Sequence, residues 1–319
     1  MHKYEIENIE HLISHFTQTY SVYKILLAVS GGQDSIYLIN ILENIKQKHK
    51  VKICYIYVDH QWKNNSLEQI KHIINCTKAI KNSITVYQIN QLTLSENECR
   101  RLRYNIIVEH ALRYQFKLVI TGHNRTDKIE TFIQNIIKGS GIESLTNLSM
   151  KSQIVEQTFI LRPLLVLDRP IIYWFCKKFF LPIWSDSTNY NYNIQRNRIR
   201  EELMPYIKQY LHRNIEDNIK SLLINYHYQN EYIKQNVMKL YLKSKHNVRA
   251  AINYNKFNNQ NFILQIKIIQ LFCFHNFQFY LENEKIIKII EQSKKKSEIS
   301  HDKNFIFFIK KNWLYLKIR

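Results

Sequence analysis

A glycine-containing hexapeptide near the start of the chain joins a predicted buried strand to a predicted helix. Residues 25–29 read ILLAV, which is apolar throughout, residues 30–35 read SGGQDS, and an amphipathic pattern follows over residues 36–42. The two glycines let the backbone approach a ligand closely. The N–H groups that begin the helix face that ligand with the positive end of the helix dipole. The hexapeptide therefore predicts a phosphate-binding loop.

Glycine is scarce elsewhere in the chain, which strengthens this prediction. Only five glycines occur in 319 residues, and the other three also adjoin predicted strand or helix ends: Gly122, Gly139 and Gly141. In a chain biased towards Ile, Asn, Lys and Tyr, a glycine is expected where a larger residue cannot be accommodated. An ordinary strand-to-helix turn is the alternative interpretation, and the agreement of the hexapeptide with both flanks disfavours it.

Predicted strands alternate with predicted helices up to residue 137. Strands are expected at residues 25–29, 51–58, 84–89 and 118–121, and helices over residues 67–80, 96–114 and 127–137. The strands are apolar enough to be buried on both faces, which predicts an α/β fold with a parallel sheet and helices on both sides. Ligands bind at the C-terminal ends of such strands, where Ser30, Asp59 and Gly122 lie.

The pattern changes from about residue 151. Residues 162–165 are expected to be extended, and helices are expected from residue 169 to 180 and from Gln195 to a stop or bend near Pro205. The remainder is predicted to be mainly helical and basic, closed by a hairpin of residues 305–309 and 313–318. We therefore expect two domains, residues 1–215 and a smaller one of residues 216–319.

The chain carries 46 basic and 26 acidic side chains, and the excess lies in its second half. Residues 1–150 hold 18 basic and 13 acidic side chains, whereas residues 151–319 hold 28 and 13. A nucleotide site does not need so much positive charge, but a surface that docks on the phosphates of a folded RNA does. Lysine enrichment through codon bias and solubility is the alternative.

Cysteine spacing and hydropathy disfavour several classes of protein. The five cysteines are widely separated and form no CxxC pair, which predicts reduced, buried thiols rather than a zinc ribbon or an iron–sulfur cluster. The N-terminal sequence MHKYEIENIEHLISHF has three glutamates and no arginine, so neither a signal peptide nor a transit peptide is expected. No window holds the roughly eighteen apolar residues of a membrane span, and we expect a soluble protein with no membrane partner.

Seven further sequence blocks follow the hexapeptide in order. They are VDHQW at 58–62, ECRRLRY at 98–104, TGH at 121–123 with Asp127 and Glu130-Thr131, GSG at 139–141, RPLL at 162–165, DSTN at 186–189 and RNRIR at 196–200. With the hexapeptide they resemble the tRNA(Ile)-lysidine synthases, a family of the PP-loop ATP pyrophosphatase superfamily. The resemblance covers residues 24–210 and implies the adenine nucleotide alpha hydrolase-like fold. The hexapeptide alone is shared with other adenylating enzymes.

Four positions depart from the pattern of this family. Asn124 and Thr126 stand where a second histidine and a paired aspartate are usual. Lys63 replaces an arginine, and Ser187 replaces a proline. A role that depends on the first aspartate of that pair is not expected here, because Thr126 stands in its place. The expected fold is unchanged.

The resemblance implies a ligase that attaches free L-lysine to the wobble cytidine of the isoleucine tRNA with a CAU anticodon. In the implied reaction, the cytosine O2 attacks the α-phosphate of ATP and releases pyrophosphate. The ε-amine of lysine then attacks C2 of the adenylated base and releases AMP. ATP as substrate, Mg²⁺, lysine and tRNA are the implied ligands, with residues 1–215 as the ATP-binding catalytic domain and residues 216–319 as the tRNA-binding domain.

The resemblance also assigns roles to residues, and local spacing supports some of them. Asp127 and Glu130 share one helix face, as do Arg196 and Arg200; a helix-dipole role for the two carboxylates is the alternative. The ATP site is expected to comprise Ser30, Gly31, Gly32, Gln33, Asp34, Ser35, Asp59, Arg103 and Gly122, with Asp34 as the metal ligand. Lysine is assigned to Asp127, Glu130 and His123, tRNA to Arg100, Arg196, Asn197 and Arg200, and catalysis to Asp34, Asp127, Glu130, Arg196 and Arg200.

Two other functions remain open at this point. A tRNA thiolase of the same superfamily would adenylate a base and deliver sulfur, but it ordinarily needs paired reactive cysteines. A non-catalytic basic RNA-binding protein is the second, and the intact Asp34, Asp127 and Glu130 disfavour it. The bias towards Ile, Asn, Lys and Tyr indicates an AT-rich genome. Such a genome favours a product that is encoded in a plastid and acts in its stroma, with the cytoplasm of a reduced bacterium as the alternative. A homodimer is left open.

Overall fold

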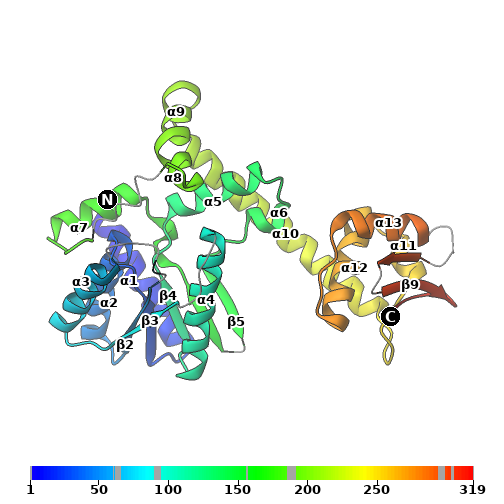
Figure 1. The fold of residues 1–319 in the computed structure, drawn as a ribbon, viewed down its shortest axis with the longest axis horizontal. Coiled ribbons are helices and arrows are strands. Elements are labelled where there is room, and N and C mark those ends of the chain that lie inside the picture. The colour runs from blue at the N-terminus through cyan, green and yellow to red at the C-terminus, as the bar shows by residue number, and fades with distance from the viewer. Residues whose placement is uncertain are drawn as a thin grey trace. The chain divides into compact units, whose positions relative to one another are not determined.

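A computed structural model describes residues 2–59, 61, 66–89, 95–155, 157–184, 192–293, 299–302 and 305–318. The chain divides into two compact units, residues 1–221 and 222–319 (Figure 1). This division lies six residues beyond the predicted boundary. The roles expected of residues 1–215 and 216–319 stay predictions.

A six-stranded sheet forms the centre of the first unit, in the order β3-β2-β1-β4-β6-β5. Its strands are β1 (Lys24–Ala28), β2 (Lys52–Asp59), β3 (Ile84–Gln88), β4 (Leu118–Thr121), β5 (Lys151–Val155) and β6 (Thr158–Leu161). All neighbouring pairs are parallel except β5 with β6. The predicted α/β class, the parallel sheet and the four strands expected from the sequence are confirmed. The sequence did not reveal β5 and β6.

Helices cover both faces of this sheet (Figure 1). The helices of this unit up to residue 178 are α1 (His2–Thr19), α2 (Gln33–Lys48), α3 (Ser66–Ala79), α4 (Glu96–Arg113), α5 (Arg125–Ile137), α6 (Ile142–Leu145) and α7 (Arg169–Lys178), of which the four-residue α6 buries no residue. Alternate residues of β1 point to opposite faces, as a pleated strand requires. Leu27 joins a core with Ile13 of α1 and Phe175 of α7, and Leu26 joins a second core with Ile107 of α4. The uninterrupted apolar run of β1 therefore reflects burial on both sides.

Two local predictions differ from the structure. Residues 162–165 were expected to be extended, but Pro163–Val166 form a 3₁₀ turn, η1, with proline at its first position. The helix that begins at Gln195 does not stop at Pro205; it runs through α8 (Gln195–Arg198), η3 (Ile199–Leu203), α9 (Met204–Tyr206) and η4 (Ile207–Leu211). The wider π-helical turns η3 and η4 flank the proline, which cannot donate a backbone hydrogen bond.

The second unit contains most of α10 (Ile215–Ser244) and an antiparallel four-stranded sheet in the order β7-β10-β9-β8. Its other elements are β7 (Ala251–Asn253), α11 (Tyr254–Asn258), α12 (Phe262–Phe277), α13 (Asn283–Ser293), β8 (Ile299–Asp302), β9 (Phe305–Lys310) and β10 (Trp313–Ile318). The predicted terminal hairpin is confirmed as β9 and β10, and Lys311 and Asn312 take the positive φ angles of its two-residue turn. None of the described helices is long and apolar enough to cross a membrane.

Candidate active site

The hexapeptide forms a tight loop between the end of β1 and the start of α2. Gly31 has a φ of +77°, and a Cβ atom there would lie 3.2 Å from Cγ1 of Ile73. The Ser35 hydroxyl accepts a hydrogen bond from the Ser30 amide at 3.2 Å and donates one to the Gly32 carbonyl at 3.0 Å. Glycine is therefore required at position 31, and Ser35 fixes the curvature of the loop.

The N-terminus of α2 has the properties of an anion-binding site. Gly32 is its N-cap residue, and no side chain caps the helix through that position. The first N–H groups of a helix have no partner within the helix, and the dipole favours negative charge there. Gln33 donates its side-chain amide to the Arg169 carbonyl at 3.1 Å, which braces the loop against α7. The arrangement fits a phosphate group of a nucleotide.

The end of β4 packs directly against this loop. A Cβ atom at Gly122 would lie 3.3 Å from Cβ of Asp34 and 3.4 Å from the Ser35 amide nitrogen. Two residues later, the buried Asn124 donates its side-chain amide to Oδ1 of Asp34 at 3.1 Å. Asn124 also accepts a hydrogen bond from the Asp127 amide at 2.9 Å, so it caps helix α5. One side chain therefore joins the loop to the helix that carries the other carboxylates.

Asp34 and Asp127 form a pair of carboxylates with opposite shifts in pKa. Burial, together with the negative charge of Asp127, raises the pKa of Asp34 to about 6. Burial also disfavours ionisation of Asp127, but the Arg196 guanidinium, the Asn124 backbone hydrogen bond and the Arg200 guanidinium outweigh it and lower the pKa of Asp127. Asp127 therefore stays ionised below pH 6, where Asp34 becomes protonated, and a nearby cation would favour the ionised form of Asp34.

Glu130 lies between two arginines and is fully buried. Nε of Arg196 donates to Oε2 of Glu130 at 2.5 Å, and Nε of Arg200 donates to Oε1 at 2.6 Å. Arg196 also donates to Oδ1 of Asp127 at 2.9 Å. The side chains of Arg196 and Arg200 are 19% and 14% exposed, whereas that of Glu130 is 0% exposed. The structure therefore brings together the two pairs that were each predicted to share a helix face, and the roles assigned to these four residues stay predictions.

The network explains how each group is held. Both oxygens of Glu130 accept guanidinium hydrogen bonds, since Arg200 adds a second bond to Oε2 at 2.9 Å. A buried carboxylate with this set of partners orients the two arginines firmly. The role of Glu130 as a lysine ligand stays a prediction, because both of its oxygens already have partners here.

His123 and Arg100 lie close to the same cluster. His123 Nδ1 shares a 3.0 Å hydrogen bond with the Thr121 hydroxyl, and burial lowers the pKa of His123 to about 3. Its ring is therefore neutral and can serve a substrate as a hydrogen-bond partner only. Burial, followed by the positive charge of Arg196, lowers the pKa of Arg100, which places Arg100 beside the cluster. Arg101, the next residue, is exposed, so α4 directs only part of its arginine run to the site.

Asp59 ends β2, the neighbour of β1, and is almost completely buried. Its Oδ1 accepts a hydrogen bond from the Gln61 amide at 3.0 Å. Its Oδ2 is buried without a hydrogen-bond partner among the described residues. A buried carboxylate oxygen in this state costs free energy unless a ligand or water donates to it. This orphaned acceptor fits the predicted nucleotide contact.

For the remaining predicted residues that the structure describes, burial or proximity to the site is what bears on their predicted roles. Arg103 is half-buried on α4 within the electrostatic reach of Arg100. Asn197 is 6% exposed, and its contact with tRNA stays a prediction. The block at residues 186–189, with His60 and Trp62, lies outside the described residues. The bridging role of Asn124 was not predicted, although an asparagine three residues before an aspartate is a recognisable capping signal.

Comparisons with known proteins agree with this geometry. The chain matches a family model described as a PP-loop domain over residues 5–207. It is 41% identical, over 295 residues, to the chloroplastic tRNA(Ile)-lysidine synthase of Gracilaria tenuistipitata var. liui, with 92% of each chain covered. The chloroplastic tRNA(Ile)-lysidine synthase of Pyropia yezoensis is 32% identical over 295 residues, covering 92% of this chain and 89% of the other.

The chain belongs to the tRNA(Ile)-lysidine synthase family. Among solved structures, the U34-tRNA thiolase NcsA from Methanococcus maripaludis superposes with a TM-score of 0.50 at 15% identity, covering 63% of this chain and 72% of the other. At that identity the likeness supports the fold alone. The two lysidine synthase relatives extend over nearly the whole chain, so the family assignment includes the second unit as well as the PP-loop domain.

Proposed function

We propose that this protein ligates L-lysine to the wobble cytidine of tRNA(Ile) with a CAU anticodon, using ATP and forming lysidine. The observation that carries the proposal is the joining of the PP-loop to the carboxylate–arginine cluster through Asn124 and Asp34. It brings a phosphate site and a site for a cationic substrate to one edge of the sheet. Membership of the tRNA(Ile)-lysidine synthase family supports the same reaction.

In the first step, the cytosine O2 attacks the α-phosphate of ATP. A P–O bond to the base forms as the bond to pyrophosphate breaks, so negative charge moves onto the departing pyrophosphate. The N–H groups at the start of α2 face that charge and stabilise it. The orphaned Oδ2 of Asp59 offers an acceptor to the nucleoside part of ATP.

Mg²⁺ fits the acidic part of this site. When bound, Mg²⁺ would supply positive charge to the phosphates, and it would need only one or two protein carboxylates because phosphates supply other oxygens. Burial and the charge of Asp127 raise the pKa of Asp34 even though Arg169 and Arg200 oppose the rise, so a further cation at this carboxylate would be favourable. Asp34 would hold the ion, while Asn124 fixes the orientation of its carboxylate.

In the second step, the lysine ε-amine attacks C2 of the adenylated base, a C–N bond forms, and the C–O bond to AMP breaks. The amine must lose a proton to attack and a second one afterwards. Asp127, whose lowered pKa keeps it ionised, is an anionic partner for the ammonium group, and the protons that the amine releases pass to water. Arg196 and Arg200, held by Glu130, face the charge that develops on AMP.

The second unit and the cellular location complete the proposal. Residues 216–319 bind the tRNA through their basic surface, and residues 1–215 carry the chemistry. The protein acts in the plastid stroma, which is supported by the chloroplastic relatives from Gracilaria and Pyropia.

The described cysteines do not favour the thiolase alternative. Cys176 donates to the Gln33 carbonyl beside the loop at 3.5 Å, and burial raises its pKa to about 12. Burial also raises the pKa of Cys76, and that of Cys273 to about 12. Thiols of this kind are poor nucleophiles because the thiolate carries sulfur chemistry.

Lysine-dependent release of AMP from ATP tests the proposed function. The wild-type protein is incubated with a tRNA(Ile) CAU transcript, and the matched control is the same transcript with uridine at the wobble position. We expect AMP and lysidine with cytidine only, and no AMP from Asp34→Asn with either transcript. AMP formation without lysine incorporation would favour the thiolase, and tRNA binding without AMP would favour the non-catalytic protein.

A further inference from the structure

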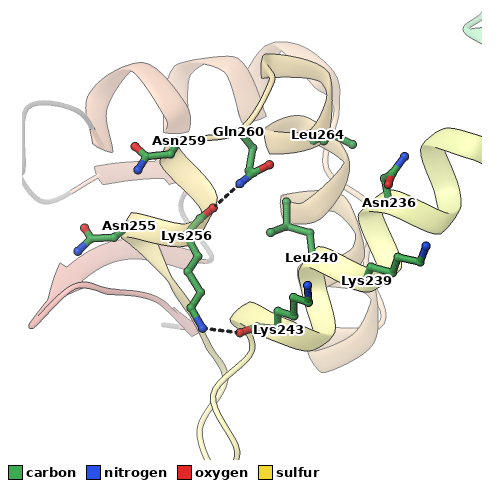
Figure 2. Close-up of a pocket in the computed structure, with 9 residues that line it drawn as sticks. All are labelled: Asn236, Lys239, Leu240, Lys243, Asn255, Lys256, Asn259, Gln260 and Leu264. Carbon is green, nitrogen blue, oxygen red and sulfur yellow. Dashed lines mark hydrogen bonds between the residues drawn. The ribbon is translucent and has the colours of Figure 1, made fainter.

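A basic groove occupies one side of the second unit, far along the chain from the PP-loop residues. It has a volume of about 700 Å³ and is lined by α10, by α11 with the loop that follows it, and by the start of α12. Lys239, Lys243 and Lys256 line it together with four amide side chains, and Leu240 and Leu264 supply its apolar surface (Figure 2). None of the nine lining residues is acidic or aromatic.

The segment that contains the groove residues carries no acidic side chain, and the acidic residues of α10, Glu216, Asp217 and Glu231, lie N-terminal to it. Residues 232–281, which include every lining residue, contain seven basic side chains and no Asp or Glu. Residues 222–319 together hold 17 basic and six acidic side chains. Within the described part of the chain, neither Lys239 nor Lys243 forms an ion pair, and both are exposed. A concave surface lined by one sign of charge concentrates counter-ions of the opposite sign.

The groove is also built to keep its shape. Nζ of Lys256 donates to the Lys243 carbonyl at 3.0 Å, so this ammonium group caps the last turn of α10. Gln260 donates to the Lys256 carbonyl at 3.1 Å (Figure 2). The buried Gln265 donates to the carbonyls of Asn258 and Gln260, at 2.9 and 2.8 Å, and holds the loop between α11 and α12. Lys239 and Lys243 lie four residues apart on one face of α10 and line the groove. The hydrogen bonds above hold the opposite wall of the groove in place.

The chemistry of the lining selects the kind of ligand. Ammonium groups donate to phosphate oxygens as point charges, and side-chain amides both donate to phosphates and accept from hydroxyl groups. Reading of unpaired bases would call for aromatic or guanidinium planes on which the bases stack. We propose that this groove binds the sugar–phosphate backbone of the tRNA substrate, with Lys239 and Lys243 on phosphates and the amides within reach of ribose 2′-hydroxyls. The proposal rests on the proposed function, because it takes tRNA as the ligand.

Reductive methylation of lysines, quantified by mass spectrometry on the full-length protein, tests the location. With tRNA(Ile) CAU transcript present, we expect Lys239 and Lys243 to be protected, whereas the exposed Lys288 and Lys310 outside the groove are not. ATP or inorganic phosphate at the same ionic strength should give no protection. Protection by those small anions but not by tRNA would show that the groove holds a free nucleotide or phosphate, and equal protection of all four lysines would show a diffuse surface; either result overturns the proposal.

A pair of charge-matched variants tests the contribution to affinity. Lys239→Ala/Lys243→Ala and the control Lys288→Ala/Lys310→Ala each remove two positive charges from the same unit. We expect the groove pair to weaken tRNA binding about tenfold and to reduce the salt slope of log K by about 1.5, with a clearly smaller change for the control pair. Equal melting temperatures would show that both variants fold. Equal losses in the two pairs would overturn the proposal.

The same preparations separate this inference from the proposed function. If the wild-type protein releases no lysine-dependent AMP, the proposed function fails. If it releases AMP and the groove pair binds tRNA as the control pair does, only the groove assignment fails.

Discussion

The side-chain amide of Asn124 donates a hydrogen bond to Oδ1 of Asp34 at 3.1 Å, across ninety residues of sequence. The same side chain caps α5 by accepting a hydrogen bond from the Asp127 backbone N–H, and the Asn124 backbone N–H donates one to Oδ2 of Asp127 at 2.9 Å. Asn124 therefore sets the position of Asp34 relative to Asp127.

Replacing Asn124 with alanine and with serine separates its two roles. Asn124→Ala should cost about 1 kcal/mol of unfolding free energy through loss of the cap. Asn124→Ser keeps an oxygen for the Asp127 amide but cannot reach Asp34, so its stability should stay close to that of the wild type. Both variants should lose AMP formation to a similar extent. Urea denaturation and the AMP assay measure the two effects, and a fully active Asn124→Ser variant would contradict the positioning role.

Gly122 gives a prediction about close packing. An alanine Cβ at Gly122 would lie 3.3 Å from Cβ of Asp34, so Asp34 or β4 must move by a few tenths of an ångström. We expect Gly122→Ala to weaken ATP binding about tenfold, because a small shift of the loop misplaces its phosphate donors. Gly141→Ala is the matched control, since a Cβ there meets no atom within 4 Å. Calorimetric titration with ATP distinguishes them; equal affinities would mean that the loop adapts freely.

Glu130 should matter for stability as well as for activity. Glu130→Gln removes the charge partner of two arginines that are mostly buried, and breaking such a network costs about 3–5 kcal/mol. Glu202→Gln is the control on η3, the segment that carries Arg200: Glu202 and its partner Arg198 are 50% and 62% exposed, and such pairs contribute about 0–1 kcal/mol. Urea denaturation of both variants measures the difference. Similar losses would show that Glu130 is not a structural anchor.

Asp127 offers a test of lysine recognition. Asp127→Asn removes the negative charge proposed to hold the lysine ammonium group, so the KM for lysine should rise at least about tenfold. The KM for ATP should change much less, because the phosphate site is built from α2. Steady-state AMP release at varied lysine and varied ATP measures both constants. An equal rise in the two would assign Asp127 a structural role instead.

Much of the fold and the site could be predicted because their signals are local. The apolar run before SGGQDS predicts β1, and the spacing of Asp127 with Glu130 places both on one helix face, as α5 shows. Pairing partners are not local: nothing near Glu130 in the sequence indicates that Arg196 and Arg200 occupy both of its oxygens. The π-helical turns around Pro205 were missed for a related reason, since a proline predicts the loss of a hydrogen bond but not how the helix adjusts.

His123 provides a prediction about pH. Burial lowers the pKa of His123 to about 3, far below the ordinary histidine value of about 6.5, so the folded protein keeps the ring neutral between pH 5 and 7. The unfolded chain binds the proton in that range and the folded chain does not, so stability falls as the pH drops below 6.5. His123→Gln should therefore reduce the loss of stability between pH 7 and pH 5 relative to the wild type. Nitrogen NMR shifts of the ring and urea denaturation at both pH values check this, and a ring that protonates near pH 6.5 in the folded protein would contradict the neutral assignment.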